Sequence, residues 1–305
     1  MKNLTGVSHQ DSMFRKKDLE QIDEVLYTAN KEELVARAII NVDDDYHPAV
    51  ETVGYDTLSE SGAAKVTANG ATDIPLVDGD TERGTQKVVT IESGFKITSQ
   101  EKRAAEMLGR DIDTNKAAIA RRVMAEKENS IVFEGDEELD IPGLVNAANI
   151  NTLDVDTDSD SDGVEWEYKT GFEIIKDIRE ARKKVSKRPG FIPNVLVLPP
   201  DQYERLQDPI NETNVNTVIS YLENMGWFDE IVSTSSLEGA DPDGDNDCGI
   251  ILDNNPAYIE LALPLDIYRH EEIKMDNNDI RINLEERLAG ALIRYPLAVC
   301  RFDGI

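Results

Sequence analysis

Basic and aromatic residues are scarce in this chain. Its 305 residues include 32 Lys and Arg against 61 Asp and Glu, so that the net charge is −29, and aromatic residues make up only 6%. So negative a chain repels phosphate, and the sequence shows no basic patch that could neutralise it, which argues against sequence-specific contacts with nucleic acid. Apolar residues make up 40% of the chain, which is enough for a packed core in one elaborate domain or two ordinary ones.

Long apolar runs and cysteine frameworks are missing as well. No apolar stretch approaches the ~20 residues that span a bilayer, and the N-terminal segment MKNLTGVSHQDSMF has no apolar signal core. Cys248 and Cys300 are too few for a disulfide framework, and we interpret them as small, semi-buried hydrophobic residues. We therefore expect a soluble protein that does not interact with a membrane.

Catalytic and cofactor motifs are also absent. The sequence contains no phosphate-binding P-loop, no GxGxxG and no GxSxG. His9, His47 and His270 stand in unrelated contexts, and no cysteine has a histidine at metal-ligand spacing. Acid pairs such as Glu285-Glu286 are too common here to select a glycosidase-like pair. We therefore predict no catalytic residue, no cofactor-binding residue and no enzymatic activity.

Acidic residues, by contrast, are abundant along the whole chain, and 32 of them are Asp. At ordinary salt such a chain repels itself, whereas at 1 M salt the Debye length falls to about 3 Å and screens the repulsion. The composition therefore indicates a protein from a hypersaline medium. The alternative is an acidic protein from an ordinary medium.

Aspartate is densest in the string DVDTDSDSDGVEWEY, residues 154–168. A calcium-binding EF-hand loop needs oxygen ligands at positions 1, 3 and 5, Gly at position 6 and Glu at position 12. Asp158, Asp160 and Asp162 take the first three places and a glycine follows, but position 12 is Lys169, which cannot bind a cation. These three aspartates are therefore only weak metal candidates, for loosely held Ca, Mg or monovalent cations.

A second aspartate run, DPDGDNDCG at residues 241–249, repeats the spacing with Cys in place of the Gly. Two such runs in one chain favour hydrated acidic insertions over two designed ion sites. No cofactor is predicted from either run.

The pattern of apolar residues predicts an α+β fold. A polar arm (residues 1–17) precedes a helix over 18–29, and the segment LVARAIINV is either a strand or a second short helix. Further helices are expected over 98–108, which starts with the capping box TSQE, and over 113–133, 170–187, 200–206 and 215–223; strands are expected in NVLVL, CGIILD, AYIELAL and GALIRYPLAVCRF.

Residues 46–90 have a different residue pattern, because Gly, Ala, Thr, Ser and Asp alternate with single apolar residues. This pattern predicts two long strands joined by a loose turn. A two-stranded ribbon is marginal by itself, and no other segment of the chain obviously supplies a surface for it.

Four strings carry a family resemblance. They are DLEQIDEVLYTANKEELVARAIINVD, DIDTNKAAIARRVMAEKENSIVFEGDEELDIPGLV, NVLVLPPDQYERLQDP and ALPLDIYRHEEIKMDNNDIRINLEERLAGALIRYPLAVCRF. The most specific feature is an F-x-G … I-x-G-L turn after a long helix, here Phe133, Gly135, Ile141, Gly143 and Leu144. In this order the strings resemble the capsid-forming family that unites tailed-phage major capsid proteins and encapsulins, the Hong Kong ninety-seven fold.

The resemblance implies an α+β major capsid fold with six parts. They are an N-terminal arm (1–17), an N-terminal helix and first core segment (18–45), an extended β-ribbon loop (46–95), a peripheral domain with a long spine helix (96–150), an apical domain with the acidic insertions (151–265) and C-terminal strands that return to the peripheral and apical core (266–305). The ribbon is then expected to lie over a neighbouring subunit. Some members of the family join their subunits covalently through a Lys and an Asn. Lys65 and Lys87 lie in or near the ribbon, but neither stands in a matching motif, so this chemistry is not carried over to the chain.

The function that the resemblance implies is structural. The chain would self-assemble into hexamers and pentamers of an icosahedral shell around the double-stranded DNA of a tailed virus with a halophilic archaeal host. Portal, decoration or turret proteins would be its other partners, and the virion capsid, assembled in the host cytoplasm, its location. The alternative is an encapsulin shell around a cargo enzyme, which the N-terminal helix favours and the long ribbon disfavours. A calcium-binding or hydrolytic enzyme is a third hypothesis that rests only on the Asp-rich loops.

Overall fold

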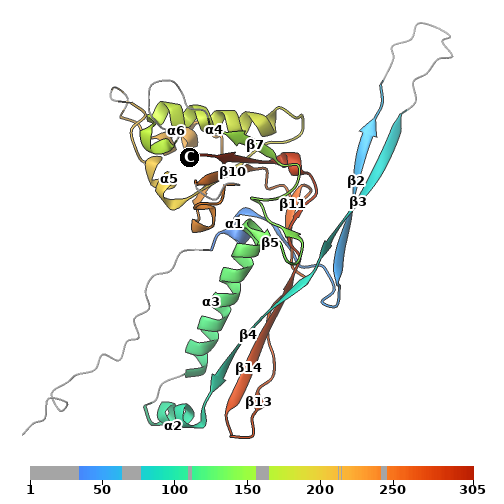
Figure 1. The fold of residues 1–305 in the computed structure, drawn as a ribbon, viewed down its shortest axis with the longest axis vertical. Helices are drawn as coiled ribbons and strands as arrows, with labels where there is room; N and C mark the ends of the chain where they lie inside the picture. The colour runs from blue at the N-terminus through green and yellow to red at the C-terminus, as the bar shows by residue number, and fades with distance from the viewer. Residues whose placement is uncertain are drawn as a thin grey trace, which may run out of the picture. The chain divides into compact units, whose positions relative to one another are not determined.

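The computed structural model of the chain describes residues 34–63, 77–108, 112–155, 165–211, 213, 215–241 and 246–305 (Figure 1). The expected N-terminal arm, the helix over 18–29 and the turn of the ribbon lie outside the described residues. The described part combines helices and sheets, which confirms the α+β prediction. Within these ranges no helix is both long and apolar enough to cross a bilayer.

A five-stranded sheet organises the region that the resemblance assigns to the apical domain. Its strand order is β7-β16-β10-β8-β9. The strands are β7 (Asn151–Asp154), β8 (Val195–Leu198), β9 (Glu230–Ser233), β10 (Cys248–Leu252) and β16 (Val299–Asp303). Every residue of β8 and β10 is buried, so both faces of the sheet have to be covered by other elements.

Three helices cover one face of this sheet, namely α4 (Gly171–Ser186), α5 (Pro200–Arg205) and α6 (Val218–Met225). Helix α4 begins at a capping box, in which the Thr170 N–H donates to Glu173 Oε2 at 2.7 Å. Its apolar stripe follows the helical period and packs on the sheet; the buried residues include Ile174, Ile178, Ala181 and Val185. Helix α6 ends at Gly226, whose φ of 60° is the left-handed conformation that favours glycine.

The opposite face packs against the middle of the chain. Here a three-stranded sheet has the order β1-β11-β15, with β1 (Val42–Asp43), β11 (Ile259–Ala262) and β15 (Gly290–Ile293). The short helix α1 (Ala36–Ile39) precedes β1, and its Ile39 is fully buried in the same apolar cluster as Val197 and Leu252. This cluster joins helix α1 and the three-stranded sheet to the five-stranded sheet.

A third region of the described chain is built around the long helix α3 (Ile112–Phe133) and the strands that pack beside it. Strand β4 (Val89–Ile97) pairs with β14 (Ile280–Leu288) over nine positions, and β12 (Leu265–Arg269) and β13 (Ile273–Lys274) complete the sheet. Helix α3 packs on it through Ala120 and Met124. The 22 residues of α3 make a rod of about 33 Å.

Helix α2 (Ser99–Leu108) lies between β4 and α3 in the sequence. The predicted capping box is present, since the Thr98 N–H donates to Glu101 Oε2 at 2.8 Å and the Glu101 N–H donates to Thr98 Oγ1 at 3.2 Å. These two bonds satisfy amides at the helix start that have no partner within the helix.

Two segments differ from the sequence-based expectation. LVARAIINV forms both a four-residue helix, α1, and the start of strand β1, instead of one or the other. GALIRYPLAVCRF, expected as one strand, is divided into β15 and β16 by a 3-10 turn at Pro296–Ala298, because proline lacks the N–H that a continuous ladder requires.

Candidate assembly surfaces

The predicted ribbon is formed by β2 (Thr52–Ser61) and β3 (Asp78–Lys87), which pair without a break from Thr52↔Lys87 to Ser61↔Asp78. In Figure 1 these strands run side by side and away from β4 and β14. Residues 78–83 of β3 are all exposed. Arg83 and Asp56 form an ion pair across the strands at 2.9 Å, with both side chains largely in solvent. The far part of the ribbon therefore offers an uncovered polar surface.

The base of the ribbon, by contrast, is anchored on its own chain, which the sequence had not indicated. Val53 is 2% exposed and packs with Ala262 of β11, Leu292 of β15 and Ala289, which directly precedes β15. The buried Gln86 donates through Nε2 to the Ala289 carbonyl. The expectation that no other segment supplies a surface is therefore wrong for the base. A few residues in and next to β11 and β15 form that surface, and they were too weak a sequence signal.

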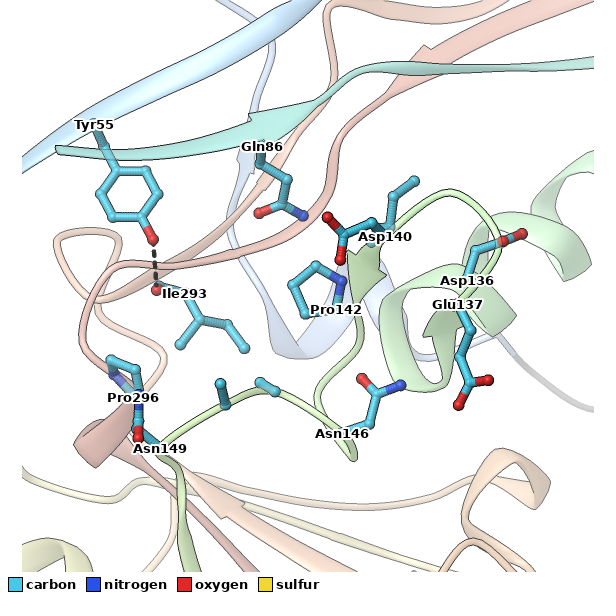
Figure 2. A pocket seen from close by; sticks show the side chains of 13 residues that line it. Tyr55, Gln86, Asp136, Glu137, Asp140, Pro142, Asn146, Asn149, Ile293 and Pro296 are labelled. Atoms are coloured by element: carbon cyan, nitrogen blue, oxygen red, sulfur yellow. Dashed lines mark hydrogen bonds between the residues drawn. The ribbon is translucent and has the colours of Figure 1, made fainter.

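A cavity of about 580 Å³ lies beside this base (Figure 2). Tyr55 and Gln86 line it from the ribbon, and the Tyr55 hydroxyl donates to the Ile293 carbonyl at 3.3 Å. The opposite side is formed by the turn after α3, with Asp136 and Glu137. The cavity is thus bounded by the ribbon on one side and an acidic turn on the other.

This turn contains the F-x-G … I-x-G-L motif. Its apolar members Phe133, Ile141 and Leu144 are 0%, 2% and 0% exposed. Gly135 has a φ of 75°, and a Cβ there would collide with the Ile141 carbonyl. A Cβ on Gly143 would collide with the Phe133 carbonyl. Two backbone segments therefore cross at a distance that only glycine permits, and the motif fixes how the spine helix turns into the next segment.

An ionic cluster with two buried carboxyl groups and a half-exposed arginine lies where α1, α3 and β14 meet. The Arg37 guanidinium donates to both carboxylate oxygens of Glu128 at 2.7 Å, and to Glu286 Oε1 and Asp266 Oδ1 at 2.9 Å. Glu286 is fully buried. Burial, followed by the hydrogen bond and charge of Glu128, raises the pKa of Glu286 to about 8. The carboxylates in turn raise the pKa of Arg37, so the arginine stays charged.

Sequence reasoning missed this cluster. Glu286 was dismissed as one of many paired acids, and Arg37 stands in a segment with no motif. The signal that was available is the alternation in β14, which places Glu286 on the same face as Ile282 and Leu284.

The three metal candidates, Asp158, Asp160 and Asp162, lie outside the described residues. Lys169, at position 12 of the candidate loop, is described, and its Nζ lies 2.9 Å from Asp177 Oδ2 with the lysine side chain 3% exposed. The Trp166 indole N–H donates to the same oxygen at 3.2 Å. Lys169 thus belongs to the packing of α4. In the parts of the chain that are described, no group of three or more His, Cys, Asp or Glu side chains could hold a metal ion.

The remaining reactive side chains have structural surroundings. Cys248 and Cys300 are free and buried, and burial raises the pKa of each thiol to about 12. Neither thiol is therefore an activated nucleophile near neutral pH. His270 Nε2 lies 2.8 Å from Glu285 Oε2 on a partly exposed surface.

A model of the family described as "Major capsid protein" matches residues 62–305. The chain belongs to this family. A curated relative, the Type 1 encapsulin shell protein EncA of Myxococcus xanthus, is 23% identical over 301 residues, which cover 98% of this chain and 96% of the relative. The family that the sequence strings pointed to is therefore confirmed.

Solved structures agree with the fold. The capsid of Myoviridae phage XM1 superposes with a TM-score of 0.79 at 13% identity, covering 97% of this chain and 100% of the phage chain. A virus-like particle from Pyrococcus furiosus superposes with a TM-score of 0.61 at 15% identity, covering 87% and 90%. At these identities the likeness concerns the fold, and it confirms the Hong Kong ninety-seven type predicted from the sequence.

Proposed function

We propose that the chain is the major capsid protein of a tailed virus, and that it self-assembles into hexamers and pentamers of an icosahedral shell around double-stranded DNA. The observation that carries the proposal is the ribbon. A family member whose β2 and β3 are fixed at the base and uncovered beyond it is suited to clamp a second copy. Permanent interfaces of this kind often bury more than about 2,000 Å².

The six-part division of the chain belongs to the same proposal. The spine helix α3 stiffens the peripheral domain, the five-stranded sheet forms the apical domain, and the ribbon and N-terminal arm reach other subunits. The chain has a structural role and no catalytic one. DNA is enclosed without base-specific contacts, and portal, decoration or turret proteins join the shell at other surfaces.

A hypersaline, archaeal host fits the net charge of −29. In molar salt the repulsion between neighbouring acidic subunits is screened, and shells are expected to loosen as salt is removed. Thermal melts against KCl concentration test this point. Equal melting temperatures in dilute buffer and in molar salt would exclude a salt-adapted protein.

The second candidate function is an encapsulin shell around a cargo enzyme. The specific observation in its favour is the match to EncA over almost the full length of both chains. The long ribbon and the full coverage of the XM1 capsid chain favour the virus.

Electron microscopy of the purified protein, with a nucleic-acid assay of the particles, decides between the two. DNA-filled shells support the viral role, whereas small shells that are empty or filled with an enzyme support the encapsulin role. A monomer at every salt concentration would contradict both.

A further inference from the structure

Charge is divided unevenly within the region of the five-stranded sheet. Residues 169–188, which contain α4, include eight Lys and Arg against three Asp and Glu. Residues 200–247, which contain α5, α6 and β9, include one base, Arg205, against twelve acids. The chain as a whole has a net charge of −29, but the segment that contains α4 is locally cationic. The expectation that the sequence has no basic patch is therefore wrong for this segment.

The basic residues of α4 lie on its outer side. The helix buries its apolar stripe on the sheet, and the periodicity of 3.6 residues leaves the rest of the surface to solvent. The exposed basic residues at and after α4 are Lys176, Arg179, Lys183, Lys184, Lys187 and Arg188. We call these six residues the basic face.

A groove of about 630 Å³ between α4 and α6 opens on the basic face. Phe172 lies in it with 64% of its surface exposed. Tyr221 and Trp227 line the groove in an edge-to-face pair with centroids 6.1 Å apart, and the guanidinium of Arg182 lies 5.8 Å from the Trp227 ring. One exposed and two half-buried aromatic side chains within a charged rim have the composition of a protein-protein contact.

The acidic residues gather at the other end of the sheet. Strand β9 is the edge strand and α5 packs on it, whereas α4 packs on β7, β16 and β10. The exposed acids of this end are Asp201, Glu204, Asp229 and Glu230. We call them the acidic edge. No basic side chain from residues 200–247 other than the half-buried Arg205 accompanies them.

We propose that the basic face of one subunit docks against the acidic edge of a second copy of this chain. The inference rests on the proposed function, since it requires that subunits assemble. Two unlike, complementary patches on one domain form a head-to-tail contact, and such a contact closes into a ring when the rotation between neighbours permits it. The aromatic groove supplies an apolar centre, and the opposite charges select which surfaces meet.

Charge reversal on either side tests the contact. One variant carries Arg179→Glu, Lys183→Glu and Lys187→Glu, a second carries Asp201→Lys, Glu204→Lys and Glu230→Lys, and a third carries all six changes. Shell yield is measured by gradient sedimentation and electron microscopy at the lowest salt at which the unmodified protein assembles. Each single set is expected to lower the yield about tenfold or more, and the combined set to restore it, because the pairs are reversed but complementary again.

Net charge needs its own control, because each set shifts it by six units and the combined set returns it to −29. The control joins the α4 set to Asp44→Lys, Asp45→Lys and Glu138→Lys, which restores the net charge without restoring the acidic edge's partner. It is expected to stay deficient in assembly. Rescue by this control would show that net charge alone matters and would overturn the inference.

Other outcomes are equally decisive. Normal shells from both single sets overturn the inference and leave the proposed function standing, whereas absence of shells from the unmodified protein contradicts both. If the α4 set lowers only the DNA content of normally formed shells, α4 faces nucleic acid and the inference is wrong. Circular dichroism melts in molar KCl show whether each variant folds. If a charge-reversal set does not fold, the same residues are replaced by Gln instead, and this Gln set is also expected to lower the shell yield.

Discussion

Arg37 Nη2 lies 2.9 Å from Glu286 Oε1, although the two residues are 249 positions apart in the chain. The same guanidinium also holds Glu128 of the spine helix. One side chain thus ties the first core segment, the spine helix and β14 together. Without the arginine, the buried carboxyl groups of Glu128 and Glu286 would lose their cationic partner.

Arg37→Met is therefore expected to destabilise the subunit by about 1–3 kcal/mol, the usual cost of leaving a buried polar group without its partner, because the arginine side chain itself is 40% exposed. Denaturant unfolding of unassembled subunits in molar KCl measures the loss. Arg83→Met is the matched control, because the Arg83–Asp56 pair is largely exposed and such pairs contribute about 1 kcal/mol or less. Equal losses of unfolding free energy for the two substitutions would show that the Arg37 cluster stabilises the subunit no more than an exposed ion pair does.

The raised pKa of Glu286 makes stability depend on pH. The folded subunit holds the Glu286 proton up to about pH 8, whereas the unfolded chain releases it near the ordinary value of 4.5. The contribution of this group is therefore complete below about pH 4.5 and declines as pH rises through about 8. In Glu286→Gln this decline is expected to disappear, so the variant gains relative to the unmodified protein at higher pH. Parallel curves of unfolding free energy between these pH values would contradict the assignment.

The crossing at Gly135 and Gly143 predicts a sharp sequence requirement. Gly143→Ala puts a methyl group against the Phe133 carbonyl, and the two backbones cannot separate without moving the end of α3. We expect a loss of about 2 kcal/mol or more, or insoluble protein. Gly54→Ala is the control, since its Cβ would meet its nearest neighbour at an ordinary 3.8 Å. A neutral Gly143→Ala would show that the turn is not needed for this arrangement.

The sequence predicted the elements whose signals are local. The capping box at Thr98, the extent of α4 and the ribbon strands all follow from residues a few positions apart, whereas the capping box at Thr170 was not predicted. The residues after the long helix indicated a turn, but the importance of Gly135 and Gly143 was indicated only by a family resemblance. A glycine shows that another group can approach closely, but it does not show which group.

The ionic cluster, the anchor of the ribbon and the basic face could not be predicted from any single segment of the sequence. Nothing near Glu286 in the sequence indicates Arg37, and nothing near Val53 indicates Ala289, because these contacts form only when the sheets are assembled. The basic face was hidden by the chain-wide excess of acid, which made local charge look uninformative. It could be recognised as a separate surface only from the strand order, because α4 and α5 pack over different ends of one sheet.

The aspartates at 158, 160 and 162 are expected to bind no ion specifically. Lys169 is held by Asp177, so the chain supplies no carboxylate at the closing position of an EF-hand loop. Calorimetric titration with CaCl₂ in molar KCl should show no saturable heat. A saturable signal that is lost in the triple variant Asp158→Asn/Asp160→Asn/Asp162→Asn would show that the loop holds a specific calcium site and would contradict this prediction.

The ribbon offers the most direct test of assembly. Leu58 and Thr81 are opposite each other in its ladder, so replacing residues 59–80 by Asn-Gly should close a short hairpin there, because this dipeptide favours the tight turn that such strands need. The anchors Val53 and Gln86 remain, and we therefore expect a folded subunit with nearly unchanged thermal stability. It should not form stable shells, since the part of the ribbon that reaches a second copy is gone. A folded variant that builds normal shells would show that the far part of the ribbon is not the clamp.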